Sequence, residues 1–408
     1  MSDARHRKIR DLLTRQFPGA WGDDPSPANK ANVSVLRSTN LDDDGHVDLS
    51  TGALRRFSSR ELVERRLLDG DILLETSGGG PGKPVGRVAL FRQVDDAVYA
   101  SSNFFRTLRV DRRIADPSFL AWRLNWMHKQ PEIWRFQQQT TGIINLRYAD
   151  YMDSTILLPS LGEQRRIAEI LNALDERIST LSAYREKVAI VGREAVRERL
   201  EVATRHAASR LDEVAFVDRG RFSARPRNDP SFYGGKYPFI QTGDITRSNG
   251  GLIATATQTL NESGLRMSRE FPAGTVAVTI AANIGDTAIL ERPMCFPDSV
   301  VGVVPFSSEM PPRFIELYIR RAKPLLEARA PQSAQKNINL QDLRPLLIPI
   351  PPLVEQREIA ALWDDQNRLV SVARNEEDEL RRLRQGLMED LLTGRVQVSQ
   401  TEAVLEDL

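Results

Sequence analysis

Two stretches of the chain carry an apolar stripe in which residues recur at alternating steps of four and three. The first copy of the stripe is Ile167, Leu171, Leu174, Ile178, Leu181 and Val188. The second copy is Ile359, Trp363, Val370, Ala373, Leu380, Leu383 and Leu387, with a polar interruption at Gln366. Such steps form a heptad seam. The pattern predicts two long helices, about 163–205 and 355–393, each with one apolar face that needs a partner.

Both expected helices open with nearly the same phrase. "LPSLGEQRRIAEIL" begins at Leu158, and "IPPLVEQREIAALW" begins at Ile350, 192 residues later. Proline fits just before or at the first turn of a helix, and Glu163 or Glu355 suits the positive end of the helix dipole. A period this long exceeds that of any solenoid. It predicts two copies of a whole unit, each a domain followed by a helix.

The segments ahead of the two helices also match. "VSVLRSTNLDDDG" at 33–45 parallels "YPFIQTGDITRSNG" at 237–250, and each reads as a strand, a polar corner and a turn. "GDILLETSGGGPGKPVGRVAL" at 70–90 parallels "AGTVAVTIAANIGDTAIL" at 273–290, and each reads as two β-runs around a loop of small residues. "TTGIINLRYADYMDSTILLP" and "SAQKNINLQDLRPLLIPIP" both carry Ile-Asn-Leu shortly before the helix.

These patterns predict a mixed α/β (α+β) fold with an internal pseudo-two-fold repeat. Two globular domains would be joined and separated by two long helices that form an antiparallel coiled coil, because copies related by a two-fold axis pack their helices in opposite directions. The expected segments are a first domain, a central helix, a second domain, a C-terminal helix and a tail, at 1–160, 161–206, 207–352, 353–396 and 397–408.

Composition narrows the class of protein. The chain has 408 residues with 41% hydrophobic residues and no apolar run long enough to span a membrane, and its N-terminus lacks the apolar stretch of a signal peptide. Cys295 is the single cysteine, which excludes an internal disulfide. We therefore expect a cytoplasmic protein that does not contact membranes.

The net charge is +1. Most basic residues are Arg, which suits bidentate contacts to phosphate and guanine, although genomic base composition alone can produce the same excess.

Signs of catalysis are weak throughout. "SGGGPGKP" departs from a phosphate-binding loop, because Lys83 is followed by Pro84 rather than Ser or Thr. "DPSF" at Asp116 faintly resembles a motif of amino-group methyltransferases, but it reads better as a helix cap with Pro117 at the first helical position. The four His residues lack metal-ligand spacing, so we expect neither a metal nor a cofactor in this chain. The sequence indicates a binding protein rather than an enzyme.

The phrase "IPIPPLVEQREIA", with the helix end "LRRLRQGLMEDLLTGRV", resembles the specificity subunits of type I restriction–modification systems. The resemblance covers nearly the whole chain. It implies a non-catalytic, DNA-binding subunit of a methyltransferase complex that acts in defence against foreign DNA. Each target-recognition domain would read one half of a bipartite, asymmetric site in double-stranded DNA. The helices would set the spacing and dock two modification subunits that carry S-adenosylmethionine, and restriction subunits that use ATP and Mg²⁺ would join them.

Candidate DNA contacts lie in the polar corners, the hairpin loops, an Arg-rich stretch and the segments before the helices. They are Arg37, Ser38, Asn40, Lys83, Arg87, Gln139, Thr140, Arg219, Arg221, Arg225, Arg227, Gln241, Thr242, Asp244, Asn283, Gln335, Lys336 and Asn337. Arg and Lys suit guanine, and Asn and Gln suit adenine; capping of turns is the alternative role for the Asn, Asp and Thr residues. Two other functions stay open: an enzyme with a fused recognition module, and a coiled-coil scaffold that binds only protein.

Overall fold

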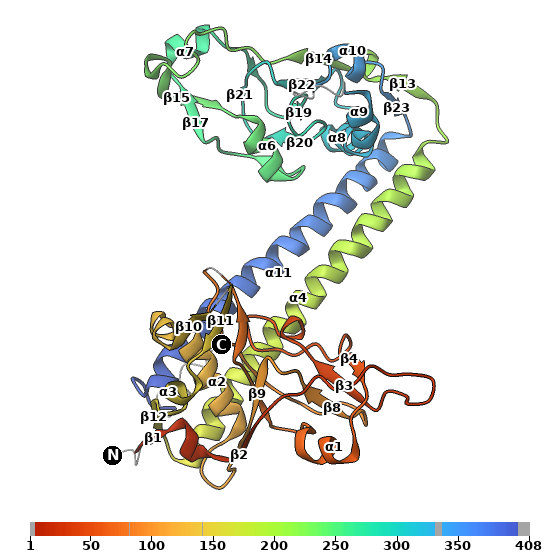
Figure 1. Ribbon diagram of the computed structural model, residues 1–408. Coiled ribbons are helices and arrows are strands. Elements are labelled where there is room, and N and C mark those ends of the chain that lie inside the picture. Colours follow the sequence, from red (N-terminus) through yellow and green to blue (C-terminus); the bar gives the residue numbers. More distant parts are fainter. Residues whose placement is uncertain (1–4, 81, 141, 331–336, 399–408) are drawn as a thin grey trace. The chain divides into compact units, whose positions relative to one another are not determined.

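The computed structural model describes residues 5–80, 82–140, 142–330 and 337–398 (Figure 1). The chain divides into two compact units. Unit 1 combines the chain up to Ser182 with the chain from Asn375 onward, and unit 2 spans Ala183–Arg374. Each unit therefore holds one mixed α/β domain and a half of each long helix.

The two long helices are α4 (Leu161–Ala203) and α11 (Leu353–Thr393), with 43 and 41 residues. In unit 1 the beginning of α4 packs on the end of α11, since Ile167 lies in one apolar core with Leu391. In unit 2 the end of α4 packs on the beginning of α11, since Leu200 lies in one core with Ile359. The pairing is antiparallel in both units, which confirms the predicted coiled coil. Among the described residues, no helix is long and apolar enough to cross a membrane.

The domain of unit 1 is built on an antiparallel sheet of four strands in the order β2-β9-β5-β7. The same domain has two three-stranded sheets, in the orders β4-β3-β8 and β10-β11-β6, and β1 pairs with β12. The strands are β1 (Arg5–Lys8), β2 (Leu13–Pro18), β3 (Val33–Leu36), β4 (Ala53–Arg55), β5 (Ile72–Glu75), β6 (Ser77–Gly79), β7 (Val88–Leu90), β8 (Tyr99–Ser101), β9 (Phe105–Val110), β10 (Gln137–Thr140), β11 (Ile143–Leu146) and β12 (Thr155–Leu158). The helices are η1 (Ile9–Leu12), η2 (Ser38–Asn40), α1 (Ser59–Arg65), α2 (Pro117–His128), η3 (Pro131–Phe136) and α3 (Tyr148–Met152).

The domain of unit 2 contains a five-stranded sheet in the order β14-β22-β19-β20-β16 and a four-stranded sheet in the order β17-β15-β21-β18. The strands are β13 (Ala208–Arg210), β14 (Ala215–Arg219), β15 (Tyr233–Phe239), β16 (Leu252–Ile253), β17 (Gln258–Leu260), β18 (Glu270–Phe271), β19 (Val276–Thr279), β20 (Thr287–Leu290), β21 (Met294–Cys295), β22 (Val300–Pro305) and β23 (Leu347–Pro349). The helices are α5 (Leu211–Val214), η4 (Pro230–Phe232), α6 (Thr242–Ser248), α7 (Glu262–Arg266), α8 (Pro312–Arg321), α9 (Lys323–Arg329) and α10 (Leu340–Leu343).

The internal repeat is visible where each domain joins its helix. In unit 1 the strand just before α4, β12, pairs antiparallel with β1, and in unit 2 the strand just before α11, β23, pairs antiparallel with β13. Helices α2 and α8 are also equivalent, and both carry proline at the first turn. Asp116 caps α2 by accepting a hydrogen bond from the backbone of Phe119, which confirms the cap expected from the sequence.

The glutamine of the repeated Glu-Gln-Arg explains why the phrase occurs twice. Gln164 and Gln356 are both buried, and each Nε2 donates to the carbonyl five residues earlier, at Pro159 or Pro351, over 2.9 Å. This bond fixes the turn from strand into long helix. Gln164 Oε1 also accepts from the backbone N–H of Asp116 over 2.9 Å.

The second copy lacks that last bond. The residue equivalent to Asp116 is Pro311, the N-cap of α8, and proline has no N–H to donate. Within the described part of the chain, Gln356 Oε1 is buried without a hydrogen-bond partner. The two junctions are therefore alike in backbone path and unequal in hydrogen bonding.

The core of unit 1 draws on residues far apart in sequence. Phe119 and Leu124 of α2 share one apolar cluster with Ile72 of β5, with Met388 of α11 and with Val398, which follows α11 and is 4% exposed. Unit 2 builds its core from one continuous segment, in which all four residues of β19 are buried.

Candidate DNA-reading surfaces

The corner after β3 in unit 1 is closed by Asn40. Its Oδ1 accepts from the backbone N–H of Arg37 over 2.8 Å, and its Nδ2 donates to the Asp48 carbonyl over 3.0 Å and to Thr51 Oγ1 over 2.8 Å. Asn40 is 2% exposed, so its hydrogen-bonding groups are used by the turn itself. Arg37 and Ser38 are half-buried and line a surface hollow together with Phe104.

The corner after β15 in unit 2 has the same construction. Asp244 takes the place of Asn40: its Oδ2 accepts from the backbone N–H of Gln241 over 2.8 Å and from Thr257 Oγ1 over 3.1 Å, and it forms an ion pair with Arg247. Asp244 is buried, whereas Gln241 and Thr242 are half-buried. Gln241 Nε2 donates to Gln258 Oε1 over 3.1 Å. The two corners match, as the sequence alignment of the halves predicts.

Arg87 supports the corner of unit 1 from the neighbouring hairpin. Its guanidinium binds the Glu75 carboxylate with two hydrogen bonds of 2.7 and 3.0 Å, and donates to the carbonyls of Leu41 (2.8 Å) and Ser38 (3.0 Å). The Glu75 carboxylate raises the pKa of Arg87, which stays charged. Arg87 therefore holds backbone, whereas Lys83 in the loop of the same hairpin is exposed.

The predicted arginines of unit 2 differ in exposure. Arg221, Arg225 and Arg227 are exposed, and Arg219 is half-buried. Arg227 forms an ion pair with Asp298 over 3.0 Å, while Arg219 and Arg221 donate to Asn339 Oδ1 (3.2 Å) and to the Ser268 carbonyl (3.0 Å). Arg225 donates to the Ala224 carbonyl over 2.7 Å.

Three predicted regions of unit 2 come together. Asn283, in the loop between β19 and β20, is exposed and donates to Thr246 Oγ1 of the corner helix α6 over 3.1 Å. Ala281 of the same loop forms a β-bridge with Asn337, which is exposed and lies before α11. The corner, the hairpin loop and the segment ahead of the helix are thus neighbours. Gln335 and Lys336 lie outside the described residues.

The matching regions of unit 1 are also neighbours. Strand β11 pairs with β6 at the start of the hairpin loop and with β10, which carries Gln139 and Thr140. Ser77 Oγ lies 2.6 Å from Asn145 Oδ1 across this pairing. Gln139 is exposed. The hairpin is thus joined to the strand that carries Gln139 through β6 and β11, and it is joined to the corner through Arg87.

The predicted seam residues divide into two groups by burial. The buried ones are Ile167, Leu171, Ile178, Leu181, Ile359 and Ala373; the half-buried ones are Leu174, Val188, Trp363, Val370, Leu380, Leu383 and Leu387. Two charged residues, Glu377 and Arg384, are buried on α11 as well. A search for apolar residues misses them, although the strict heptad register from Ala373 through Leu380 places both on the seam. Among the described residues, no group of three or more His, Cys, Asp or Glu could hold a metal ion.

The chain is similar to known proteins in sequence and in structure. Residues 207–382 match the family model described as the type I restriction modification DNA specificity domain. The chain is 22% identical to a Methanocaldococcus jannaschii protein named as the type I restriction enzyme MjaX specificity subunit, over 96% of this chain and 93% of that one. Among solved structures, it resembles the type I restriction–modification S subunit from M. genitalium, with a TM-score of 0.63, 15% identity and 96% of both chains covered. A second structure, described as explaining complex assembly and conformational transition of the type I R-M system, gives a TM-score of 0.53 at 21% identity, covering 96% of this chain and 98% of that one. These likenesses establish the fold.

Proposed function

We propose that this chain recognises a bipartite, asymmetric sequence in double-stranded DNA. The premise is that the chain is a relative of type I specificity subunits and that residues 207–382 match their DNA specificity domain. The observation that carries the proposal is the internal repeat of a corner-bearing domain followed by an antiparallel helix. Two readers with different side chains suit two different half-sites. The chain selects the sequence and catalyses no reaction.

The proposed contacts to DNA are those predicted residues that solvent reaches in part or in full. They are Arg37, Ser38, Lys83, Gln139, Arg219, Arg221, Arg225, Arg227, Gln241, Thr242, Asn283 and Asn337. Asn40, Arg87 and Asp244 are given a different role, because their polar groups already bind the chain's own turns. In this proposal those three residues shape the corners, and the exposed neighbours read bases or bind phosphates.

The long helices are proposed to set the distance between the half-sites and to dock two modification subunits. The proposed segments remain a first recognition domain at 1–160, a helix at 161–206, a second recognition domain at 207–352 and a helix at 353–396. S-adenosylmethionine would be carried by the modification subunits, and ATP with Mg²⁺ by restriction subunits. Such a complex acts on DNA in the cytoplasm.

The first test is a map of DNA methylation. The chain is co-expressed with the modification subunit from the same genome in a host without adenine methylation, and modified adenines are located by sequencing. We expect one split sequence, modified in both halves. A stable complex that leaves the DNA unmodified, and that shows no sequence-dependent footprint, would contradict the proposed recognition role.

The spacing role has a separate test, the removal of one heptad from each helix. Residues 182–188 and 370–376 lie between two helix-to-helix contacts, Asp175 with Arg384 and Gly192 beside Gln366. Seven residues of helix correspond to about 10 Å, or at most ~3 base pairs. The double deletion should shorten the spacer and leave both half-sites unchanged. An unchanged spacer would show that the helices do not set it.

A further inference from the structure

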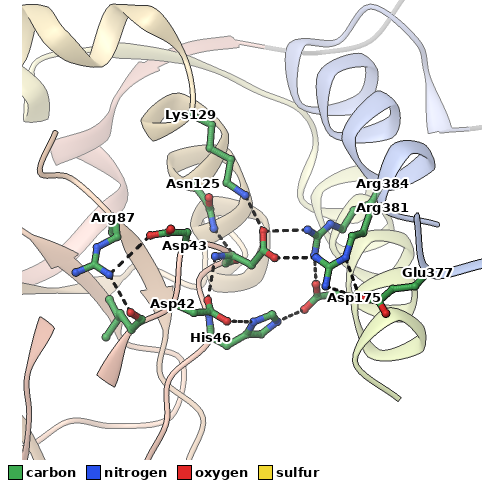
Figure 2. Close-up of polar contacts among 12 residues, drawn as sticks. Asp42, Asp43, His46, Arg87, Asn125, Lys129, Asp175, Glu377, Arg381 and Arg384 are labelled. Atoms are coloured by element: carbon green, nitrogen blue, oxygen red, sulfur yellow. Dashed lines mark hydrogen bonds and ion pairs between the residues drawn. The ribbon is translucent and has the colours of Figure 1, made fainter. Parts of the chain in front are cut away.

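The loop of residues 42–47, which follows directly on the corner of unit 1, rests on both long helices (Figure 2). In the 42–47 loop, Asp44 and His46 contact the long helices, and Asp42 binds His46 within the loop. Asn125 of α2 holds the loop backbone by donating from Nδ2 to the Asp44 carbonyl over 2.8 Å. A residue from the domain's own helix thus presents the loop to α4 and α11.

Asp44 is the centre of the first set of contacts. It forms ion pairs with Lys129 at the end of α2 (2.8 Å), with Arg381 (3.1 Å) and with Arg384 (3.0 Å) of α11. Burial acts to raise the pKa of Asp44, but the hydrogen bond from Lys129 and the charges of Arg384 and Arg381 lower it to about 2. Asp44 is therefore an anion at neutral pH.

His46 is the centre of the second set. Its Nδ1 lies 2.7 Å from Asp42 Oδ2, and its Nε2 lies 2.6 Å from Asp175 Oδ2 of α4. Hydrogen bonds to Asp175 and Asp42 raise the pKa of His46 to about 10, so the imidazole is a cation at neutral pH. Asp175 also pairs with Arg384, whose side chain is 7% exposed. Three loop residues, Asp42, Asp44 and His46, therefore form one network of alternating charge with Lys129 and with Asp175, Arg381 and Arg384 of the long helices.

Arg384 is the buried cation on which this network depends. A guanidinium this deeply buried needs full pairing, and Asp44 and Asp175 supply it from the loop and from α4. Arg381 is bound on its other side by Glu377 over 3.0 Å. Loss of Asp44 would leave two helix arginines short of one carboxylate. The buried charges thus favour one position of the loop on the helices.

Hydrogen bonds connect the 42–47 loop to the corner of unit 1. Asp42 donates its backbone N–H to the His46 carbonyl over 3.2 Å, and Arg87 binds the carbonyls of Leu41 and Ser38 on the corner side. A shift of the loop on the helices must therefore shift the backbone around Arg37 and Ser38. This is a connected path of hydrogen bonds rather than mere proximity.

Unit 2 ties its equivalent loop to α11 with different chemistry. Arg313 of α8, 7% exposed, donates to the Gly250 carbonyl and pairs with Asp364 of α11 over 2.8 Å, and Arg320 donates to Asn249 Oδ1 over 3.2 Å. The base lies on the domain helix here, and the acid lies on α11. Both units thus connect the loop after the corner to α11 through charged side chains, directly in unit 1 and by way of Arg313 in unit 2, which indicates that fixing this loop matters in both units.

We propose that Asp44 and His46 are positioning residues that fix the DNA-reading corner of unit 1 on the helix pair, and that Arg313 and Asp364 do the same in unit 2. The inference rests on the proposed function, because a corner has a half-site to read only if the chain recognises DNA. Each pair of residues then governs the fidelity of one half-site and leaves the other unchanged.

The test compares Asp44→Asn with Asp364→Asn in the full complex with its modification subunit, by mapping methylated adenine across a genome. Asp44→Asn should lower the preference for the true first half-site over single mismatches by about tenfold, the size of a lost coupling in an ion-pair network. Asp364→Asn should do so for the second half-site alone. Glu64→Gln, which removes an exposed ion pair with Arg60 on α1 (2.9 Å), is the matched control and should change neither.

Further variants separate positioning from loss of folding. Asp44→Glu keeps the charge and should restore part of the preference, and the milder His46→Gln should weaken it in the same half-site. Amide exchange in the peptide covering residues 37–48 should accelerate in Asp44→Asn and stay unchanged in Glu64→Gln. A variant complex that assembles and methylates with unaltered first half-site preference overturns the positioning role. A wild-type complex without any split sequence overturns the proposed function, and the positioning role with it.

Discussion

The repeated glutamine allows one prediction to be worked out in detail, because Gln164 makes two hydrogen bonds, to the Asp116 N–H and to the Ile114 carbonyl, that have no counterpart at Gln356. Methionine is close to glutamine in length and has no strong donor or acceptor, so Gln164→Met and Gln356→Met remove the amide while nearly keeping the volume. Gln164→Met removes the partner of the Asp116 N–H and of the Pro159 carbonyl, and it also removes the longer bond of 3.3 Å to the Ile114 carbonyl. Gln356→Met strips the partner from the Pro351 carbonyl, and it also removes an acceptor that was unsatisfied among the described residues.

The magnitudes follow from the cost of unsatisfied groups. A buried polar group without a partner costs about 1–3 kcal/mol, so Gln164→Met should destabilise its junction by roughly 2–4 kcal/mol. In Gln356→Met the loss at Pro351 and the gain from removing the unpaired Oε1 nearly offset each other, which leaves roughly 0–1 kcal/mol. The same substitution should thus be severe in one copy and mild in the other.

Amide hydrogen exchange measured by mass spectrometry reports both junctions separately. Peptides covering the first turns of α4 and α11 are compared in the wild type and in each variant. Protection at the α4 junction should fall by about 100-fold in Gln164→Met, and protection at the α11 junction by less than about tenfold in Gln356→Met.

A third variant tests the cause. Pro311→Asp supplies the missing N–H and a capping carboxylate at the start of α8. In that background Gln356→Met should become as costly as Gln164→Met. Equal losses in the two original variants, or a Gln356→Met cost that Pro311→Asp leaves unchanged, would refute the reasoning.

Three further predictions concern single residues. His46→Gln should lower the free energy of unfolding most at pH 6.5 and below, and the difference from wild type should vanish as the pH rises through 10, because the raised pKa favours the folded protonated form; urea titrations across this range measure it. Gly394→Ala should lower the thermal midpoint through a loss of about 1–2 kcal/mol, since φ is 74° and the new Cβ would lie 2.5 Å from Leu157 Cδ2. Asn40→Ala should destabilise the fold by about 1–3 kcal/mol, whereas Ser38→Ala should leave stability unchanged and weaken DNA binding, as paired melting and footprinting experiments would show.

The sequence predicts the long helices well because their signal is periodic over many turns. The expected ranges 163–205 and 355–393 compare with observed helices at 161–203 and 353–393. The antiparallel direction followed from the repeat alone. The paired corners were also predictable, since strand, polar turn and glycine recur in the same order at 33–45 and 237–250.

The loop contacts with the helices were not predictable from the sequence. Asp44 and Arg384 are 340 residues apart, and no local sequence pattern around either residue indicates its partner. Charged residues at seam positions resemble interruptions of a coiled coil, so the apolar pattern predicts Leu383 as the seam residue rather than Arg384. The sequence also could not show that Asn40 and Asp244 close turns, because the same residue types serve equally well to contact bases.

The two units also differ in when they can be completed during synthesis. The core of unit 2 is encoded by one continuous stretch, Ala183–Arg374. The core of unit 1 includes Met388, Leu391 and Val398, which are translated after both globular domains. The first domain to be translated is therefore the last to close its core, and in the interval the apolar face of Ile167 and Leu171 lacks its partner. A truncation ahead of Met388 would damage the core of the N-terminal domain more than that of the second domain, although the second domain lies nearer to the cut.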